Sequence, residues 1–179
     1  MKILKNNLSN NLNIRTEKDF PKAGIEFIDI NPLIMDNKLL NEITDKFYNE
    51  LKDKNIDYIV APESRGFLFA PSVCDRLKVG LIPVRKKGKL PPSTVESSFS
   101  YEKEYGKDIL ELPKLIDSKY EGKNFYIIDD IFATGNTVNS IKEVILSLGG
   151  NVIGIGVIIN IVKLNNEKEL FSLIDVEEE

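Results

Sequence analysis

Short apolar segments alternate with helix-like segments along most of this chain, and that alternation restricts the fold more than any other feature. The strand-like apolar segments are residues 56–61, 79–84, 124–128 and 152–159. Segments before and between them carry apolar residues at helical spacing, namely 37–54, 66–77 and 137–148. This order predicts an α/β domain whose mostly parallel central sheet is covered by helices on both faces. Ligands of such sheets bind beyond the carboxyl ends of the strands, so the loops after Ala61, Val84 and Ile128 are the first candidates for a site.

The composition excludes several classes of function. The chain has 179 residues, one cysteine (Cys74) and no histidine, so we expect one domain without catalytic triads or imidazole metal sites. Any metal would be a hard, oxygen-bound cation such as Mg²⁺. A lone cysteine and the absence of a membrane-length apolar run favour a cytoplasmic protein without a membrane partner. The net charge of −4 argues against nucleic acid as a partner.

Two regions lack a clear period. Residues 1–19 are polar and are interpreted as an N-terminal extension with a short helix, ahead of a single domain over residues 20–179. Residues 86–107 are rich in Lys, Gly, Pro, Ser, Glu and Tyr. A loop of that length inside a compact domain is typically functional or disordered. Residues 109–112 are expected to form a strand that closes it.

The strongest chemical pattern runs from residue 125 to residue 137. An apolar strand leads into Asp129 and Asp130, and a short loop then precedes a helix. Unpaired N–H groups and the positive end of the helix dipole favour an anion there. We therefore interpret residues 133–137 as a phosphate loop, made of Ala133, Thr134, Gly135, Asn136 and Thr137. The two carboxylates would repel a phosphate, so we expect them to bind vicinal hydroxyls, such as those of a ribose, or to approach a metal indirectly.

Two further segments carry features of anion sites. Glu63, Ser64, Arg65 and Gly66 lie between a predicted strand and a predicted helix. An arginine in such a turn can bind a phosphate through two N–H groups. The run from Arg85 to Lys89 is densely basic, although such a run is also found on plain solvated surfaces.

Taken together, these segments resemble the type I phosphoribosyltransferases. Residues 127–137 resemble the motif with which that family binds 5-phosphoribosyl 1-pyrophosphate (PRPP), and residues 20–30, 63–69, 84–91 and 104–107 resemble its adenine-specific members. The resemblance implies a type I phosphoribosyltransferase fold, with a mostly parallel sheet flanked by helices, a small N-terminal hood and a flexible loop over about residues 86–107. It also implies transfer of the phosphoribosyl group from PRPP to adenine, giving AMP and pyrophosphate in purine salvage. Mg²⁺ is the implied cofactor, and a homodimer is the implied assembly.

The resemblance also implies a role for each candidate residue. The ribose and phosphate of PRPP or AMP are expected at Asp129, Asp130 and the phosphate loop. Pyrophosphate is expected at Glu63, Ser64 and Arg65, with an unusual peptide geometry at Glu63–Ser64, and at Arg85, Lys86 and Lys89 of the neighbouring subunit. Adenine is expected to stack on Phe27, while backbone groups of Ile25 and Ile28 read its edge. Catalysis is assigned to Glu104, Tyr105 and Arg65, with Glu104 as the candidate acceptor of the adenine proton. Mg²⁺ is expected to bind through PRPP and water, without a direct protein ligand.

Three departures from the family pattern bear on specificity. Asn136 stands where a second glycine is usual, Ile28 where many members carry Arg, and Asn160 where an acid is common. Asn tolerates left-handed backbone better than other non-glycine residues, which would preserve the loop. Two alternatives stay open: a phosphoribosyltransferase for hypoxanthine, guanine or xanthine, and a non-catalytic PRPP-sensing regulator.

Overall fold

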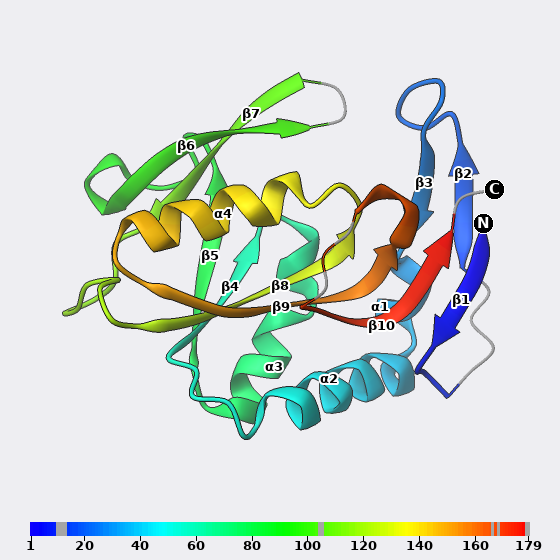
Figure 1. The fold of residues 1–179 in the computed structure, drawn as a ribbon, viewed down its shortest axis with the longest axis horizontal. Helices are drawn as coiled ribbons and strands as arrows, with labels where there is room; N and C mark the ends of the chain where they lie inside the picture. Colours follow the sequence, from blue (N-terminus) through cyan, green and yellow to red (C-terminus); the bar gives the residue numbers. More distant parts are fainter. Residues whose placement is uncertain (10–13, 104–105, 166, 168, 178–179) are drawn as a thin grey trace.

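Within the described residues, the main sheet has eight strands in the order β1-β10-β9-β8-β4-β5-β7-β6 (Figure 1). The computed structural model describes residues 1–9, 14–103, 106–165, 167 and 169–177. The five central strands run parallel to one another: β10 (Leu170–Glu177), β9 (Asn151–Ile161), β8 (Asn124–Phe132), β4 (Tyr58–Pro62) and β5 (Gly80–Lys86). The mostly parallel α/β sheet predicted from the alternation is therefore confirmed.

Helices cover both faces of this sheet (Figure 1). α2 (Asn37–Leu51) and α3 (Ala70–Leu77) lie on one face, and α4 (Asn136–Ser147) lies on the other. α2 begins where the Asp36 carboxylate accepts from the Lys38 and Leu39 amides. The remaining helical segments are α1 (Asn31–Met35), η1 (Arg65–Leu68), η2 (Pro92–Thr94) and η3 (Val162–Leu164).

The helix predicted over residues 66–77 is divided into η1 and α3. Pro71 lies in the first turn of α3 and has no N–H, so an α-helical bond to the carbonyl four residues earlier cannot form. Cys74 is buried in α3, and burial raises the pKa of its thiol to about 12. That side chain therefore packs in the core as a neutral thiol.

The short helix predicted within residues 1–19 is wrong. The segment contains two strands, β1 (Lys2–Asn6) and β2 (Arg15–Lys18). β1 pairs antiparallel with β10 at the sheet edge, and β2 pairs with β3 (Glu26–Asp29) in a separate ribbon. Backbone pairing with distant partners decides these structures, because the polar side chains supply no strand period. The domain boundary at residue 20 stays a prediction, although β1 is a strand of the main sheet.

The flexible loop predicted over about residues 86–107 contains regular structure that the sequence did not indicate, while its flexibility stays a prediction. After η2 the chain forms β6 (Val95–Lys103), which pairs antiparallel with β7 (Gly106–Pro113). β7 includes the strand predicted over residues 109–112 and pairs with the end of β5. Alternate residues of β6 from Val95 to Tyr101 are more buried than those between them, but a serine interrupts the apolar set, and this weakens the pattern in the sequence.

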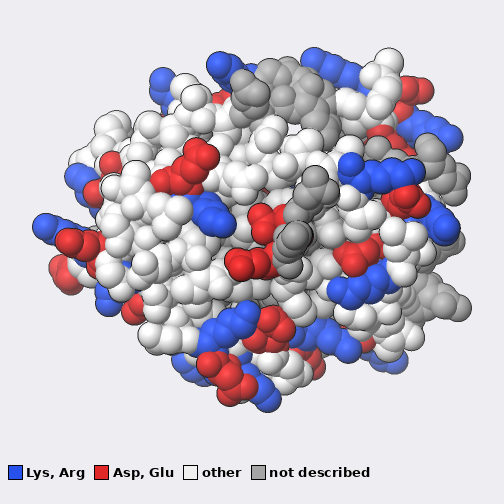
Figure 2. All heavy atoms as spheres, in the orientation of Figure 1, with Lys and Arg blue, Asp and Glu red and all other residues white. Residues whose placement is uncertain are grey.

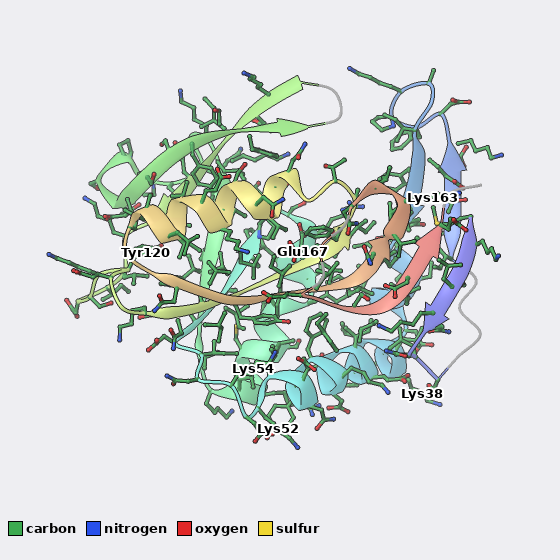
Figure 3. The ribbon with its side chains drawn as sticks, in the orientation of Figure 1. Lys38, Lys52, Lys54, Tyr120, Lys163 and Glu167 are labelled. Carbon is green, nitrogen blue, oxygen red and sulfur yellow. The ribbon has the colours of Figure 1, made fainter. Side chains whose placement is uncertain are left out.

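The core forms two clusters, one on each face of the sheet. β8 supplies both, since Tyr126 and Ile128 belong to one cluster while Phe125 and Ile127 belong to the other. Tyr120, labelled in Figure 3, stacks on Phe125 with ring centroids 5.1 Å apart, and its hydroxyl donates to the Pro113 carbonyl. These contacts fix β8, the strand that carries the two acids.

Charged side chains of both signs are interspersed among the described residues of the face shown in Figure 2. A mixed pattern of this kind favours a small ligand over the continuous basic surface of a nucleic-acid groove. Among the described residues, no helix has the length and apolar character needed to cross a membrane.

Candidate active site

The carboxyl ends of β4 and β8 bring the first two candidate segments together. β8 extends through Asp129 and Asp130 to Phe132, while β4 leads into η1. Gly66 permits this approach, since a Cβ there would lie 3.1 Å from the Ile128 carbonyl oxygen and 3.3 Å from Asp129 Oδ1. A side chain at position 66 would therefore push residues 63–66, here called the arginine turn, away from Asp129 and Asp130.

An ion pair joins these two segments at the site. Arg65 Nε lies 2.8 Å from Asp130 Oδ2, and Asp130 is only 3% exposed. The contact is close enough for an ion pair but lacks hydrogen-bond geometry, so Asp130 Oδ2 and Arg65 Nη1 are buried without a hydrogen-bond partner among the described residues. A buried, unsatisfied guanidinium donor has unused capacity for an anionic ligand, and the carboxylate oxygen has unused capacity for a donor.

Asp129 lies beside this pair with its side chain half-buried. Burial, followed by the negative charge of Asp130, raises the pKa of the Asp129 carboxyl well above its usual range. The negative charge of the Asp129 carboxylate is thus costly in this place. A ligand that donates hydrogen bonds or brings positive charge would offset that cost.

The phosphate loop has the conformation that its glycine permits. Gly135 has φ +78°, and α4 begins at the next residue, Asn136. A Cβ on Gly135 would lie 2.5 Å from Phe132 Cζ, so the ring fills the space beneath the loop. Asn136 is helical and has no positive φ. Its tolerance for left-handed backbone is therefore not needed, and the missing second glycine leaves the fold of the loop intact.

Glu63 connects the arginine turn to the basic run. The Glu63–Ser64 peptide is cis, so the unusual geometry predicted there is confirmed. Glu63 Oε2 accepts from the Lys86 amide at 2.9 Å and from Arg85 Nε at 3.0 Å. These contacts, the Lys86 amide first, lower the pKa of Glu63. Arg85 is thus paired within its own chain, whereas Lys86 and Lys89 are exposed.

The β2–β3 ribbon brings Phe27 to the same site. The Arg65 guanidinium carbon lies 5.6 Å from the centre of the Phe27 ring, and Phe20 packs edge-on against that ring at 5.2 Å. Ile28 is 3% exposed and belongs to the core, because successive side chains of a strand point to opposite faces. Phe27, Arg65 and Asp130 therefore form a continuous row from three distant parts of the sequence.

Comparison with known proteins gives this arrangement its family. Residues 34–176 match the phosphoribosyl transferase domain. The adenine phosphoribosyltransferase of Clostridium acetobutylicum is 46% identical over 157 residues, covering 88% of this chain and 89% of that protein. The chain belongs to the phosphoribosyltransferase family, type I.

Solved structures agree with this assignment. A crystal structure of adenine phosphoribosyltransferase from Thermoanaerobacter pseudethanolicus has a TM-score of 0.82 and 40% identity, covering 91% of this chain and 95% of that one. The Saccharomyces cerevisiae enzyme, solved with an imino-altritol bisphosphate and adenine, has a TM-score of 0.78 and 34% identity, covering 89% and 93% of the two chains. The predicted type I phosphoribosyltransferase fold is confirmed.

Two predicted catalytic residues of this phosphoribosyltransferase, Glu104 and Tyr105, lie outside the described residues. The described residues do bring together Arg65, both acids, Phe27 and the arginine turn, and the phosphate loop continues directly from β8. The described residues contain no group of three or more acidic or cysteine side chains arranged to hold a metal ion.

Asn165 is a contact of the site that the sequence does not indicate. Its side-chain amide contacts the phosphate loop at the Ala133 carbonyl. Asn165 lies in a stretch of mixed polar residues, which carries no signal for this contact.

Proposed function

We propose that this phosphoribosyltransferase transfers the 5-phosphoribosyl group of PRPP to adenine, giving AMP and pyrophosphate in purine salvage. The observation that carries the proposal is the row formed by Phe27, Arg65 and Asp130 beside the phosphate loop. An aromatic ring suited to a base, a cation suited to pyrophosphate and a carboxylate suited to ribose hydroxyls lie together in this row, and this supports the proposal. The names of the similar enzymes support adenine as the acceptor.

The reaction replaces one bond at ribose C1. The C1–O bond to pyrophosphate breaks and its electron pair leaves with pyrophosphate, while adenine N9 forms the new bond to C1 and loses its proton. Backbone N–H groups of the phosphate loop hold the 5′-phosphate, and Asp129 and Asp130 accept hydrogen bonds from the ribose hydroxyls. The Arg65 guanidinium stabilises the negative charge that develops on pyrophosphate as it leaves, and its unsatisfied Nη1 supports that role. Glu104 stays our candidate for accepting the proton.

Mg²⁺ fits this donor set if the substrate supplies most of its ligands. Mg²⁺ commonly binds through one or two carboxylates together with phosphates and water. Asp129 and Asp130 would act on the ion through its bound water, since Asp130 Oδ2 has unused capacity to accept a hydrogen bond. When bound with PRPP, the ion would neutralise charge on the pyrophosphate leaving group.

Adenine would be recognised by stacking and by backbone groups. A purine needs a flat apolar partner, and Phe27 is half-buried with its ring against Arg65. The Ile25 N–H donates to the Lys22 carbonyl at 3.3 Å, and the Ile25 carbonyl accepts from the Phe20 N–H at 3.3 Å. A carbonyl oxygen has two lone pairs, so that of Ile25 would accept a second hydrogen bond, from the adenine amine. Ile28 would act only through its backbone, since its side chain is in the core.

A homodimer would complete the pyrophosphate site. We propose that Lys86, Lys89 and Arg85 act on the neighbouring subunit's pyrophosphate. Arg85 is paired with Glu63 of its own chain, so pyrophosphate would bind to it either in place of that contact or beside it. Mixed dimers of Asp130→Asn and Arg85→Ala should recover activity, because one of the two sites can then be intact. Failure to recover activity despite proven subunit exchange would restrict Arg85 to its own chain.

The experiment that tests base choice is a parallel product assay with PRPP, Mg²⁺ and adenine, hypoxanthine, guanine or xanthine. A 6-oxo purine presents an acceptor where the pocket needs a donor, which costs about 1–3 kcal/mol for each unpaired group. Two such mismatches of about 1.4 kcal/mol or more each predict at least about 100-fold preference for adenine in kcat/KM. Equal turnover of hypoxanthine would favour the alternative purine enzyme, and PRPP binding without any product would favour the regulator.

A further inference from the structure

Asn165 follows η3 and lies against the first residue of the phosphate loop. Its Nδ2 lies 2.9 Å from the Ala133 carbonyl oxygen, and 3.0 Å from both the Ile161 carbonyl oxygen and Asn160 Oδ1. An amide nitrogen carries only two N–H groups, so the three acceptors share them. The other end is also fixed, because Asn165 Oδ1 accepts from the amide of Glu167, which Figure 3 labels in the same loop.

The Ala133 carbonyl is a sensitive point at which to hold this loop. It shares a planar trans peptide unit with the Thr134 N–H, so the two bonds point in opposite directions. Fixing the carbonyl toward Asn165 therefore directs the Thr134 N–H the other way. A hydrogen bond to the carbonyl also polarises that N–H and makes it a better donor.

The support extends from the loop to the sheet edge. Asn160 Nδ2 donates to Asp175 Oδ1 at 3.3 Å, between residues that are paired in the β9–β10 ladder. The Ser172 hydroxyl donates to the same carboxylate at 2.5 Å, and Lys5 Nζ lies 3.8 Å from its other oxygen. Asn165 thus contacts β9 directly, and its partner Asn160 is in turn held by Asp175 of β10, which Lys5 of β1 approaches.

We propose that Asn165 is a positioning residue that sets the Ala133–Thr134 peptide of the phosphate loop for the 5′-phosphate of PRPP. The inference rests on the proposed function, because PRPP is the ligand concerned. Phe132 supports the loop from beneath Gly135, and Asn165 fixes the point at which the chain enters it. Together they hold the backbone N–H groups of the phosphate loop in place before PRPP binds, which lowers the entropy that the loop loses on binding.

Asn165→Asp is the sharpest test, since it keeps the shape of the side chain but places an oxygen against three oxygens. We expect KM for PRPP to rise at least about tenfold, while kcat changes less than about threefold and KM for adenine at saturating PRPP less than about twofold. Asn165→Ala should raise KM for PRPP by a smaller factor, and serves if the first variant does not fold. Asn151→Asp is the matched control, because Asn151 is exposed and its amide also donates to an asparagine side chain, that of Asn124.

Thermal unfolding of the ligand-free variants separates positioning from plain stabilisation. A lowered Tm with equal losses toward both substrates, or an unchanged KM for PRPP in both Asn165 variants, would overturn the inference alone. Failure of the unsubstituted chain to bind PRPP in a calorimetric titration would overturn the proposed function and this inference together. A rise confined to KM for PRPP, absent in Asn151→Asp, is the expected result.

Discussion

Replacing Gly135 by alanine should disturb the phosphate loop through two separable effects. Gly135 has φ +78°, a conformation that costs an ordinary residue about 1–2 kcal/mol. Its new Cβ would also lie 2.5 Å from Phe132 Cζ and 3.1 Å from Asn139 Nδ2, and overpacking of this kind typically costs about 1–3 kcal/mol. The combined effect on the free energy of unfolding is therefore about 2–5 kcal/mol if the loop keeps its position.

A loop that moves to relieve the clash would transfer this cost to substrate binding. Urea unfolding and KM for PRPP should accordingly be measured on the same preparations of Gly135→Ala. We expect a lower free energy of unfolding, a higher KM for PRPP, or both.

Gly122→Ala is the matched control for the conformational part. Gly122 has φ +72°, but nothing lies within 4 Å of the position where its Cβ would be. This control should lose only about 1–2 kcal/mol and leave KM for PRPP unchanged. Equal destabilisation of the two variants, with KM for PRPP unaltered in both, would refute the argument that Phe132 supports the loop.

Three further substitutions test the acids and the base site. Asp130→Asn should lower kcat/KM by roughly 10- to 1000-fold, about 1.4–4 kcal/mol of transition-state stabilisation, and an unchanged value in a folded variant would remove ribose binding from its role. Asp129→Asn should reduce activity but raise the free energy of unfolding of the ligand-free protein at pH 7. Because the folded state raises the pKa of Asp129, the protonated carboxyl favours folding at low pH, and this contribution is lost as pH rises from about 4 through the folded-state pKa. The difference between the variant and the unsubstituted chain in urea unfolding should therefore shrink toward pH 4. Phe27→Ala should raise KM for adenine more than KM for PRPP, and equal changes in steady-state kinetics would argue against stacking.

Much of the sheet could be predicted because its central strands are buried on both faces. Residues 125–128 form a continuous apolar run, and so do most of residues 152–159. β1 could not be predicted in this way, since it is a polar edge strand held by backbone pairing with β10. β6 was hidden for a related reason, because Ser97 occupies an inward position where an apolar residue would have completed the alternation.

In the candidate site, too, residues that are contiguous in the sequence could be predicted, whereas contacts that depend on the three-dimensional fold could not. Its members in residues 125–137 form one contiguous pattern, so the sequence indicates them directly. The pairing of Arg65 with Asp130 depends on which strands are neighbours, and β4 lies beside β8 only through sheet topology. The contact of Asn165 with Ala133 depends on the path of a loop, for which the sequence carries no periodic signal.

The most direct test of the central claim is a single measurement of AMP and pyrophosphate formed from PRPP and adenine in the presence of Mg²⁺. We predict that the two products appear in equal amounts, and that pyrophosphate release depends on adenine. Pyrophosphate released equally well without adenine, or no AMP from a chain that binds PRPP, would contradict the account.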